Sequence, residues 1–266
     1  MVLKHRKRSS RIDQADAELL PRIREIKAAH PFWGYRRVWS YLRYREQIII
    51  GKNRVYRILT EHDLLVTRQN KLKACRTPER SKPKTTVPNE LWGIDMTKVF
   101  VESWGWVYLH VVKDWGSKKI VGWQLSARSK TEDWLEALQL ALNAQFPDGV
   151  REATDGQLKL VSDNGCQPTS TRFMAACSVL EVKQIFTSFN NPKGNADTER
   201  VFRTIKEDLI WLQEWTSFQQ LYNALEQWIE DYNTDFPHSS IEQLTPCQYE
   251  QDYINNKSNK HSLIKS

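Results

Sequence analysis

The sequence predicts an α/β fold preceded by a small helical module, and three observations support this prediction. Strand and helix patterns alternate along the chain from about residue 89. Before residue 66 the apolar residues recur only at helical spacing. Between these regions, residues 67–88 combine seven basic residues with three prolines and show almost no apolar periodicity. We therefore expect two folded parts joined by an extended basic linker.

The first predicted helix lies in a module that spans residues 13–66. Its apolar residues recur every three or four positions and are Leu19, Leu20, Ile23, Ile26 and Ala29. Proline is tolerated in the first turn of a helix, so we expect this helix to begin at Pro21. Pro31 ends it. Residues 1–12 form a basic arm, which we interpret as disordered or as contacting DNA, because it lacks the apolar segment of a secretory signal.

Two further helices are expected in this module, over residues 35–44 and 52–59. The later one carries several basic and polar side chains. A short helix followed by a basic helix is typical of a helix-turn-helix that binds DNA. The alternative is a small helical bundle with a solvated basic face. The candidate DNA-binding residues are Arg36, Arg37, Lys52, Arg54 and Arg57, and the expected groove contacts are Arg54 and Arg57.

Charge is distributed unevenly along the chain. Residues 1–88 carry 22 Lys and Arg against 8 Asp and Glu, a net charge of +14, whereas residues 89–266 carry 17 against 24, a net charge of −7. A basic front joined to an acidic remainder indicates a nucleic-acid-binding module attached to a second function. The four cysteines form no close pair, which argues against a zinc knuckle, and no long uncharged apolar run indicates a membrane span.

The second folded part, residues 89–250, has the element order βββαβαβα. Its strands are rich in β-branched and aromatic residues and are expected over residues 92–101, 106–114, 119–127, 158–162 and 182–187. Its helices are expected over residues 131–146, 171–180, 196–215 and 217–233. Trp211 and Trp215 are one helical turn apart and, with Trp228, are expected in the core or at a subunit contact. Residues 251–266 are expected to form a flexible tail.

Three carboxylates stand out in this second part. Asp95 lies within an apolar strand, where an unpaired charge is costly. Asp163 directly follows the fourth strand, and Glu199 lies near the start of the helix after the fifth. Each of the later two also has a structural interpretation: Asp163 before Asn164-Gly165 favours a turn, and Glu199 suits the positive end of a helix dipole. Three convergent carboxylates are nevertheless the ligands that two divalent metals need for phosphoryl transfer.

The order and spacing of these carboxylates resemble the aspartate–aspartate–glutamate core of bacterial insertion-sequence transposases and retroviral integrases. Thirty-five residues separate Asp163 from Glu199, and Lys206 follows the glutamate by seven positions. The segment His30-Pro31-Phe32-Trp33-Gly34-Tyr35-Arg36-Arg37 resembles an HPxxGYRR signature upstream of the catalytic core in these transposases. The resemblance covers about residues 14–250.

The end of the core also resembles this family. Asp231-Tyr232-Asn233, Pro237-His238 and Leu244-Thr245-Pro246 are similar to its terminal YN…RPH…L…TP segment. Phe236 stands where an arginine is common, which puts one charge contact in doubt. For His238, a DNA contact and a packing role both remain open.

The resemblance implies an RNase H-like integrase core, a five-stranded mixed sheet with flanking helices whose first and fourth strands are neighbours. It implies that Asp95, Asp163 and Glu199 are the catalytic residues and the ligands of two Mg²⁺ ions, for which Mn²⁺ can substitute. The implied reaction is metal-dependent 3′-end cleavage and strand transfer at insertion-sequence ends. Lys206 is implied to contact the reacting DNA end, and further DNA-binding candidates are Lys193, Asn195, Arg200 and Arg203.

The expected partners are double-stranded DNA, as terminal inverted repeats and as target, and further copies of the chain assembled on it. The chain resembles the downstream, catalytic frame of a two-frame family, so an upstream-frame protein or fused segment is another expected partner. We therefore expect the chain in the bacterial cytoplasm, associated with the nucleoid. We expect no membrane partner. Two other functions remain open: a catalytically inactive DNA-binding protein derived from a transposase, and a nuclease of the same fold that acts on RNA–DNA hybrids.

Overall fold

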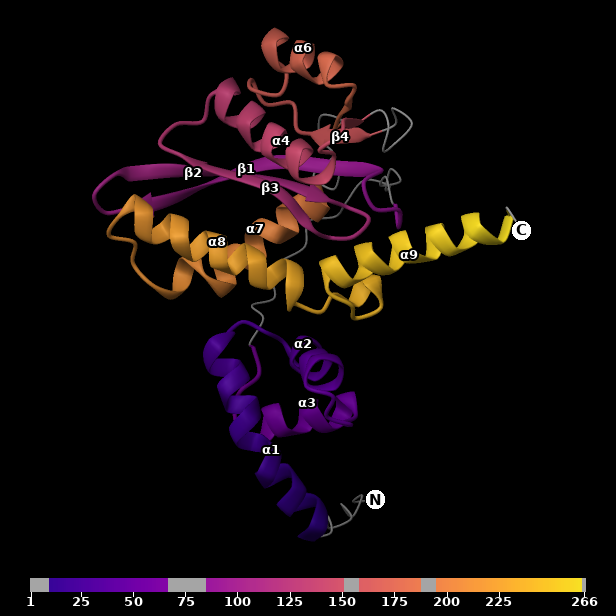
Figure 1. Ribbon diagram of the computed structural model, residues 1–266. Helices are drawn as coiled ribbons and strands as arrows, with labels where there is room; N and C mark the ends of the chain where they lie inside the picture. The colour runs from indigo at the N-terminus through magenta and orange to yellow at the C-terminus, as the bar shows by residue number, and fades with distance from the viewer. Residues whose placement is uncertain (1–9, 67–84, 151–157, 188–194, 265–266) are drawn as a thin grey trace, which may run out of the picture. The chain divides into compact units, whose positions relative to one another are not determined.

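The computed structural model describes residues 10–66, 85–150, 158–187 and 195–264 (Figure 1). The chain divides into two compact units, Met1–Ala74 and Cys75–Ser266. Each unit has its own apolar core, as expected for separate domains. No helix among the described residues is long and apolar enough to cross a membrane.

The N-terminal unit is helical, as the sequence predicts. Its elements are α1 (Ser10–Ala29), α2 (Tyr35–Ser40), the π-helical turn η1 (Tyr41–Arg45) and α3 (Lys52–Glu61). The apolar faces of these helices meet in one core. That core contains Ile23, Ile26, Trp33, Val38, Leu42, Val55, Ile58 and Leu59, all nearly or fully buried.

The predicted start of the first helix is wrong. The helix α1 runs continuously through Pro21 and begins at Ser10. Proline in a helix interior removes the hydrogen bond to the carbonyl four residues earlier, here that of Ala17. Both Pro21 and Ala17 are exposed, so water can satisfy that carbonyl. The helix therefore tolerates this proline on its solvent side.

The C-terminal unit contains the expected five-stranded mixed sheet. Its strands are β1 (Leu91–Val101), β2 (Gly105–Asp114), β3 (Ile120–Ser126), β4 (Lys159–Ser162) and β5 (Lys183–Phe186). The strand order is β3-β2-β1-β4-β5. The β1–β2 and β2–β3 pairs are antiparallel, while β1–β4 and β4–β5 are parallel, so the first and fourth strands are neighbours as the resemblance implied.

Helices cover both faces of this sheet (Figure 1). On one face lie α4 (Thr131–Gln145) and α6 (Thr171–Val179), which share a core with Trp92 and Ile94 of β1. On the other lie α7 (Ala196–Asp208) and α8 (Phe218–Thr234). Because neighbouring strand residues point to opposite faces, Gly93 and Asp95 of β1 face the α7 side.

Two predicted boundaries in this unit need correction. The helix α7 ends at Asp208, not near residue 215, and a short turn, η2 (Ile210–Leu212), follows it. This break buries Trp215, whose indole Nε1 donates to the Ile210 carbonyl at 3.1 Å, and leaves Trp211 63% exposed instead of in the core. The tail expected from residue 251 is instead helical, since α9 (Pro246–Ile264) continues almost to the end of the chain.

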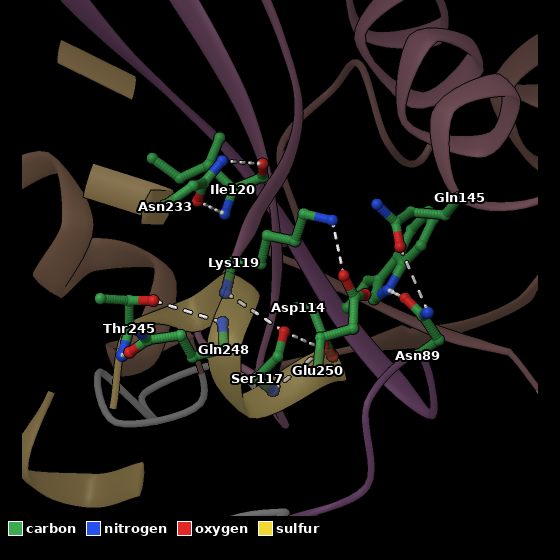
Figure 2. Close-up of polar contacts among 11 residues, drawn as sticks. Asn89, Asp114, Ser117, Lys119, Ile120, Gln145, Asn233, Thr245, Gln248 and Glu250 are labelled. Atoms are coloured by element: carbon green, nitrogen blue, oxygen red, sulfur yellow. Dashed lines mark hydrogen bonds and ion pairs between the residues drawn. The ribbon is translucent and has the colours of Figure 1, made fainter. Parts of the chain in front are cut away.

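The last helices are fastened to the β2–β3 turn by polar contacts (Figure 2). Asn233 at the end of α8 accepts from the Ile120 amide at 2.9 Å and donates to the Ile120 carbonyl at 3.0 Å. Lys119 pairs with Glu250 of α9 at 2.6 Å. The short turn η3 (Ser239–Ile241) connects these helices. Asn233, part of the terminal motif, therefore has a structural role.

Candidate active site

The parallel pairing of β1 with β4 places two of the expected carboxylates at the same level of the sheet. Gly93 is opposite Val161; Asp95 lies two residues further along β1, and Asp163 lies two residues after Val161, directly past the end of β4 at Ser162. Residues two apart in a strand point to the same face. Local hydrogen bonds orient both carboxylates: Oδ1 of Asp95 accepts from the Met96 amide at 2.8 Å, and Oδ1 of Asp163 accepts from the Gly165 amide at 3.0 Å.

The third carboxylate comes from the first turn of α7, which packs on the same face of β1. Glu199 is exposed, while its neighbour Thr198 is fully buried against the sheet. The amide Nδ2 of Asn195 donates to the Ile94 carbonyl at 3.4 Å, which joins the start of α7 to the strand residue next to Asp95.

The charges of Asp163, Glu199 and Lys206 all act on Asp95. Burial raises the pKa of Asp95 to about 7, against a hydrogen bond from the Met96 amide that lowers it. The charges of Asp163 and Glu199 raise this pKa further, and the Lys206 ammonium lowers it. The fold therefore gathers negative charge around a partly buried carboxylate, as sites for cations do.

The donors at this site suit a hard divalent cation. Within the described residues, no three His, Cys, Asp or Glu side chains are already close enough to hold one ion. Mg²⁺ usually binds through one or two carboxylates together with water and substrate phosphate, so a ready-made cage is not required. Burial is the main cause of the raised Asp95 pKa, and a bound cation would offset the added charges of Asp163 and Glu199, so the residues present fit the metal.

The expected DNA contacts near this site divide into three groups. Arg200 and Arg203 on α7 are exposed, and they pair within the helix with Asp197 at 3.4 Å and Glu207 at 2.8 Å. Asn195 is only 5% exposed and bonds to β1, so the predicted direct DNA contact is replaced by a role in positioning α7. Lys193 lies outside the described residues.

In the N-terminal unit the two arginines expected to read DNA are engaged inside the fold. Arg54 pairs with Asp16 of α1 at 2.6 Å, and Arg57 pairs with the other oxygen of the same carboxylate. Although burial acts to raise the pKa of Asp16, the hydrogen bonds from both guanidinium groups hold it below its ordinary value. These contacts join α1 to α3 and make both arginines poor candidates for groove contacts.

Another face of α3 is open to solvent. Its exposed side chains follow one another at helical spacing and are Lys52, Asn53, Tyr56 and Thr60. We call these four residues the α3 face. Tyr56 packs edge-on against Tyr35 of α2 at 5.0 Å, and Arg36 lies over the Tyr35 ring at 5.7 Å. Lys52 lies over the Trp39 ring at 4.5 Å. Arg37 lies over the Trp33 ring at 5.5 Å.

Phe236, which stands where an arginine is common in the resembled family, fills an aromatic cluster. Its ring is 5.7 Å from that of Trp228 and 5.9 Å from that of Tyr232, and its side chain is buried. The His238 ring contacts Tyr232 edge-on at 4.9 Å, which favours the packing role that the sequence left open.

Sequence reasoning missed the residues that hold α7 in place. Lys113 and Trp115, in and just after β2, bond to the first turn of this helix at Asp197 and Thr198. Lys113 could have been identified by its charge inside an otherwise apolar strand, because an unpaired charge there is costly. The same argument singled out Asp95.

Comparison with known proteins gives matches along most of the chain. Residues 85–192 and 180–246 match models of an integrase core domain, and residues 14–71 match a model of an HTH-like domain. A transposase assigned to insertion sequence element IS986/IS6110 of Mycobacterium tuberculosis is 26% identical over 92% of this chain and 91% of its own length. Transposase InsD of insertion element IS2 from Escherichia coli is 24% identical over 88% of this chain and 78% of its own.

One solved structure adds a match in fold. A chain of a simian T-cell lymphotropic virus intasome superposes with a TM-score of 0.51 at 17% identity, covering 86% of this chain and 74% of that one. At this identity the likeness concerns the fold alone.

Proposed function

Since this chain belongs to the insertion-sequence transposases, with an integrase core behind an HTH-like domain, we propose that it cleaves the 3′ ends of its element and joins them to target DNA. The observation that supports the proposal is that the charges of Asp163 and Glu199 both act on the partly buried Asp95. A structural turn or helix cap would not require this.

We propose that Asp95, Asp163 and Glu199 hold two Mg²⁺ ions, or Mn²⁺ in their place. When bound, these metals supply an activated water or 3′-hydroxyl and stabilise the leaving oxygen. The β1–β4 pairing and the contact of Asn195 with β1 support this proposal, since they hold the two strand ends side by side and the start of α7 against the strand that carries Asp95.

Lys206 is proposed to hold the DNA end next to the scissile bond. It lies two helical turns after Glu199, on the same side of α7, and its charge reaches Asp95. An ammonium has no lone pair to offer a metal at neutral pH, so its role is a contact to phosphate or to a base edge. Arg200 and Arg203 extend this positive surface along the helix.

The N-terminal unit is proposed to grip the terminal repeats as double-stranded DNA. The α3 face carries the side-chain chemistry of groove readers: an asparagine amide suits adenine, and lysine suits guanine. Arg36 and Arg37 on α2 can contact the phosphate backbone. Copies of the chain are proposed to assemble on the element ends and target, alone or with an upstream-frame segment, in the bacterial cytoplasm at the nucleoid.

The test is incubation of the full chain with labelled inverted-repeat ends and Mg²⁺ or Mn²⁺, followed by mapping of nicks and joined products. Metal-dependent nicks at the 3′ ends and strand-transfer products are expected. Binding of the repeats without any metal-dependent nick would point instead to an inactive DNA-binding protein. Faster cleavage of RNA–DNA hybrids than of duplex ends would point to a nuclease.

A further inference from the structure

The first turn of α7 is held on the sheet by side chains from β2 and the turn after it. Trp115 donates its indole Nε1 to Oγ1 of Thr198 at 3.1 Å, and Lys113 donates its ammonium to the Asp197 carbonyl at 2.9 Å. Both acceptors lie one or two residues before Glu199 in the same turn.

The residue opposite Lys113 on β1 makes room for these contacts. Gly93 pairs with Lys113 across the antiparallel strands, and a Cβ atom there would lie 2.1 Å from Oγ1 of Thr198 and 2.4 Å from Nε1 of Trp115. No side chain fits at those distances. The helix α7 can therefore approach β1 this closely only because residue 93 is a glycine. Gly93 lies two residues before Asp95.

The ammonium of Lys113 is expensive to keep where it is. The residue is 3% exposed, and burial lowers the pKa of Lys113 to about 7, opposed by the nearby Asp197 charge. The Lys113 ammonium also lies beside the positive end of α7, where the helix dipole does not stabilise a cation. An apolar side chain of similar length would avoid both costs, so the hydrogen bond to α7 is the contribution that distinguishes lysine at this position.

We propose that Lys113, Trp115, Thr198 and Gly93 form a lock, the α7 lock, that fixes the first turn of α7 and so positions Glu199 beside Asp95. These are positioning residues, since none of them is proposed to touch metal or DNA. The link to metal binding rests on the function proposed above for Glu199, whereas the lock itself does not.

The experiment uses the full chain with matched substitutions. Thr198→Val removes the acceptor with little change of shape, and Thr198→Ser keeps the hydroxyl. Thr204→Val is the control, because that buried threonine of α7 bonds to the Arg200 carbonyl of its own helix at 3.0 Å and not to the sheet. Lys113→Met removes the ammonium, and Gly93→Ala forces the two surfaces apart.

The first measurement is amide hydrogen exchange, which needs neither metal nor DNA. Amides of residues 198–202 should exchange about tenfold faster in Thr198→Val and Lys113→Met, while those of α4 keep their protection. Thr198→Ser and Thr204→Val should resemble the unmodified protein. Unchanged exchange in both Thr198→Val and Lys113→Met would overturn the lock, as would an equal effect of Thr204→Val. Gly93→Ala, if it folds, should show the largest local effect.

The second measurement is the Mn²⁺ concentration that gives half-maximal thermal stabilisation. It should rise about tenfold in Thr198→Val and Lys113→Met, with DNA affinity unchanged, because a misplaced Glu199 weakens only the metal site. Faster exchange with an unchanged metal titration would overturn the connection to Glu199. If the unmodified chain cleaves no DNA, the proposed reaction fails, and the exchange measurement still decides whether the lock exists.

Discussion

Each unit of this protein contains a group of charged residues, and the two groups are built in opposite ways. In the N-terminal unit, opposite charges are paired inside the fold: Asp16 of α1 receives both Arg54 and Arg57 of α3. In the C-terminal unit, like charges are brought together, with Asp163 and Glu199 both acting on Asp95. Pairing stabilises a structure, whereas a cluster of carboxylates costs stability until a cation arrives. The comparison teaches that the presence of charged residues does not by itself indicate a function, whereas their arrangement as opposite-charge pairs or as like-charge clusters does.

The largest expected effect comes from neutralising one carboxylate of the cluster. Asp95→Asn, Asp163→Asn and Glu199→Gln should each abolish cleavage and strand transfer and leave DNA binding intact. Asp95→Asn should also raise the metal-free melting temperature, by about 2–4 °C for each kcal/mol of repulsion relieved. Cleavage assays and metal-free thermal unfolding measure the two effects. The control is Glu136→Gln, an exposed carboxylate of α4.

The contrast between the two groups of charges would be contradicted if the three carboxylates proved to stabilise the fold instead of binding metal. Loss of metal-free stability in all three variants would show this, and so would robust cleavage by two of them.

The next largest effect is expected from Lys206, whose charged side chain acts on the carboxylate cluster. Lys206→Ala should slow end cleavage by about tenfold to a hundredfold at subsaturating DNA, because a charge-assisted contact to DNA contributes about 1.5–3 kcal/mol. Its Mn²⁺ titration should stay close to that of the unmodified chain. Lys206→Arg should recover part of the rate if the contact is to phosphate. Cleavage rate against DNA concentration is the measurement, and an unchanged rate for Lys206→Ala would mean that this lysine is merely solvated.

A third effect separates the α3 face from the general positive charge of the N-terminal unit. Asn53→Ala should weaken binding of the cognate repeat by about 1–3 kcal/mol if its amide reads a base edge. Lys52→Ala should reduce the slope of log affinity against log salt by about one if it contacts phosphate. The matched control is Arg24→Ala, an exposed cation of α1. Equal losses for Arg24→Ala and the α3 variants would show that the unit binds DNA through net charge alone.

The last effect, which leaves catalysis untouched, is on the stability of the N-terminal unit. Asp16→Asn should destabilise it by about 1–3 kcal/mol, because two partly buried guanidinium groups lose their shared acceptor. The folded pKa of Asp16 lies below its ordinary value of 3.8, so its contribution is complete above that pH and is lost as the pH falls through the folded pKa. Asp16→Asn should therefore flatten the acid limb of the unfolding profile. An unchanged midpoint at pH 7 would contradict a stabilising pair.

Much of the fold could be predicted because strong local patterns agreed with the tertiary structure. All five strands were expected within about two residues, since each combines β-branched and aromatic residues between clear turns. Pro21 was misjudged because a proline rule that considers only the backbone ignores which side of the helix faces water. The end of α7 was misjudged because the chain after it is held by a distant segment: the Glu102 amide, in the β1–β2 turn, donates to the Trp215 carbonyl at 2.8 Å.

The candidate site was predictable in part, for a similar reason. Asp95, Asp163 and Glu199 could be proposed because their residue type, order and spacing resemble a known catalytic core, and their role stays a prediction. The pairing of Arg54 and Arg57 with Asp16 joins residues about forty positions apart, and helical periodicity within α3 carries no trace of it. Asn195 was assigned to DNA from its place in a loop of Gly and Asn residues, whereas its burial and its contact with β1 favour a supporting role for α7.

The contact between Asn233 and Ile120 has a consequence for how copies of this protein can associate. β3 is an outermost strand of the sheet, and such strands invite pairing with a strand from another molecule. Asn233 occupies both the amide and the carbonyl of Ile120, at the beginning of that strand. A side chain of α8 thus takes the place that an intruding strand would need, and protects this sheet edge from aggregation where β3 begins.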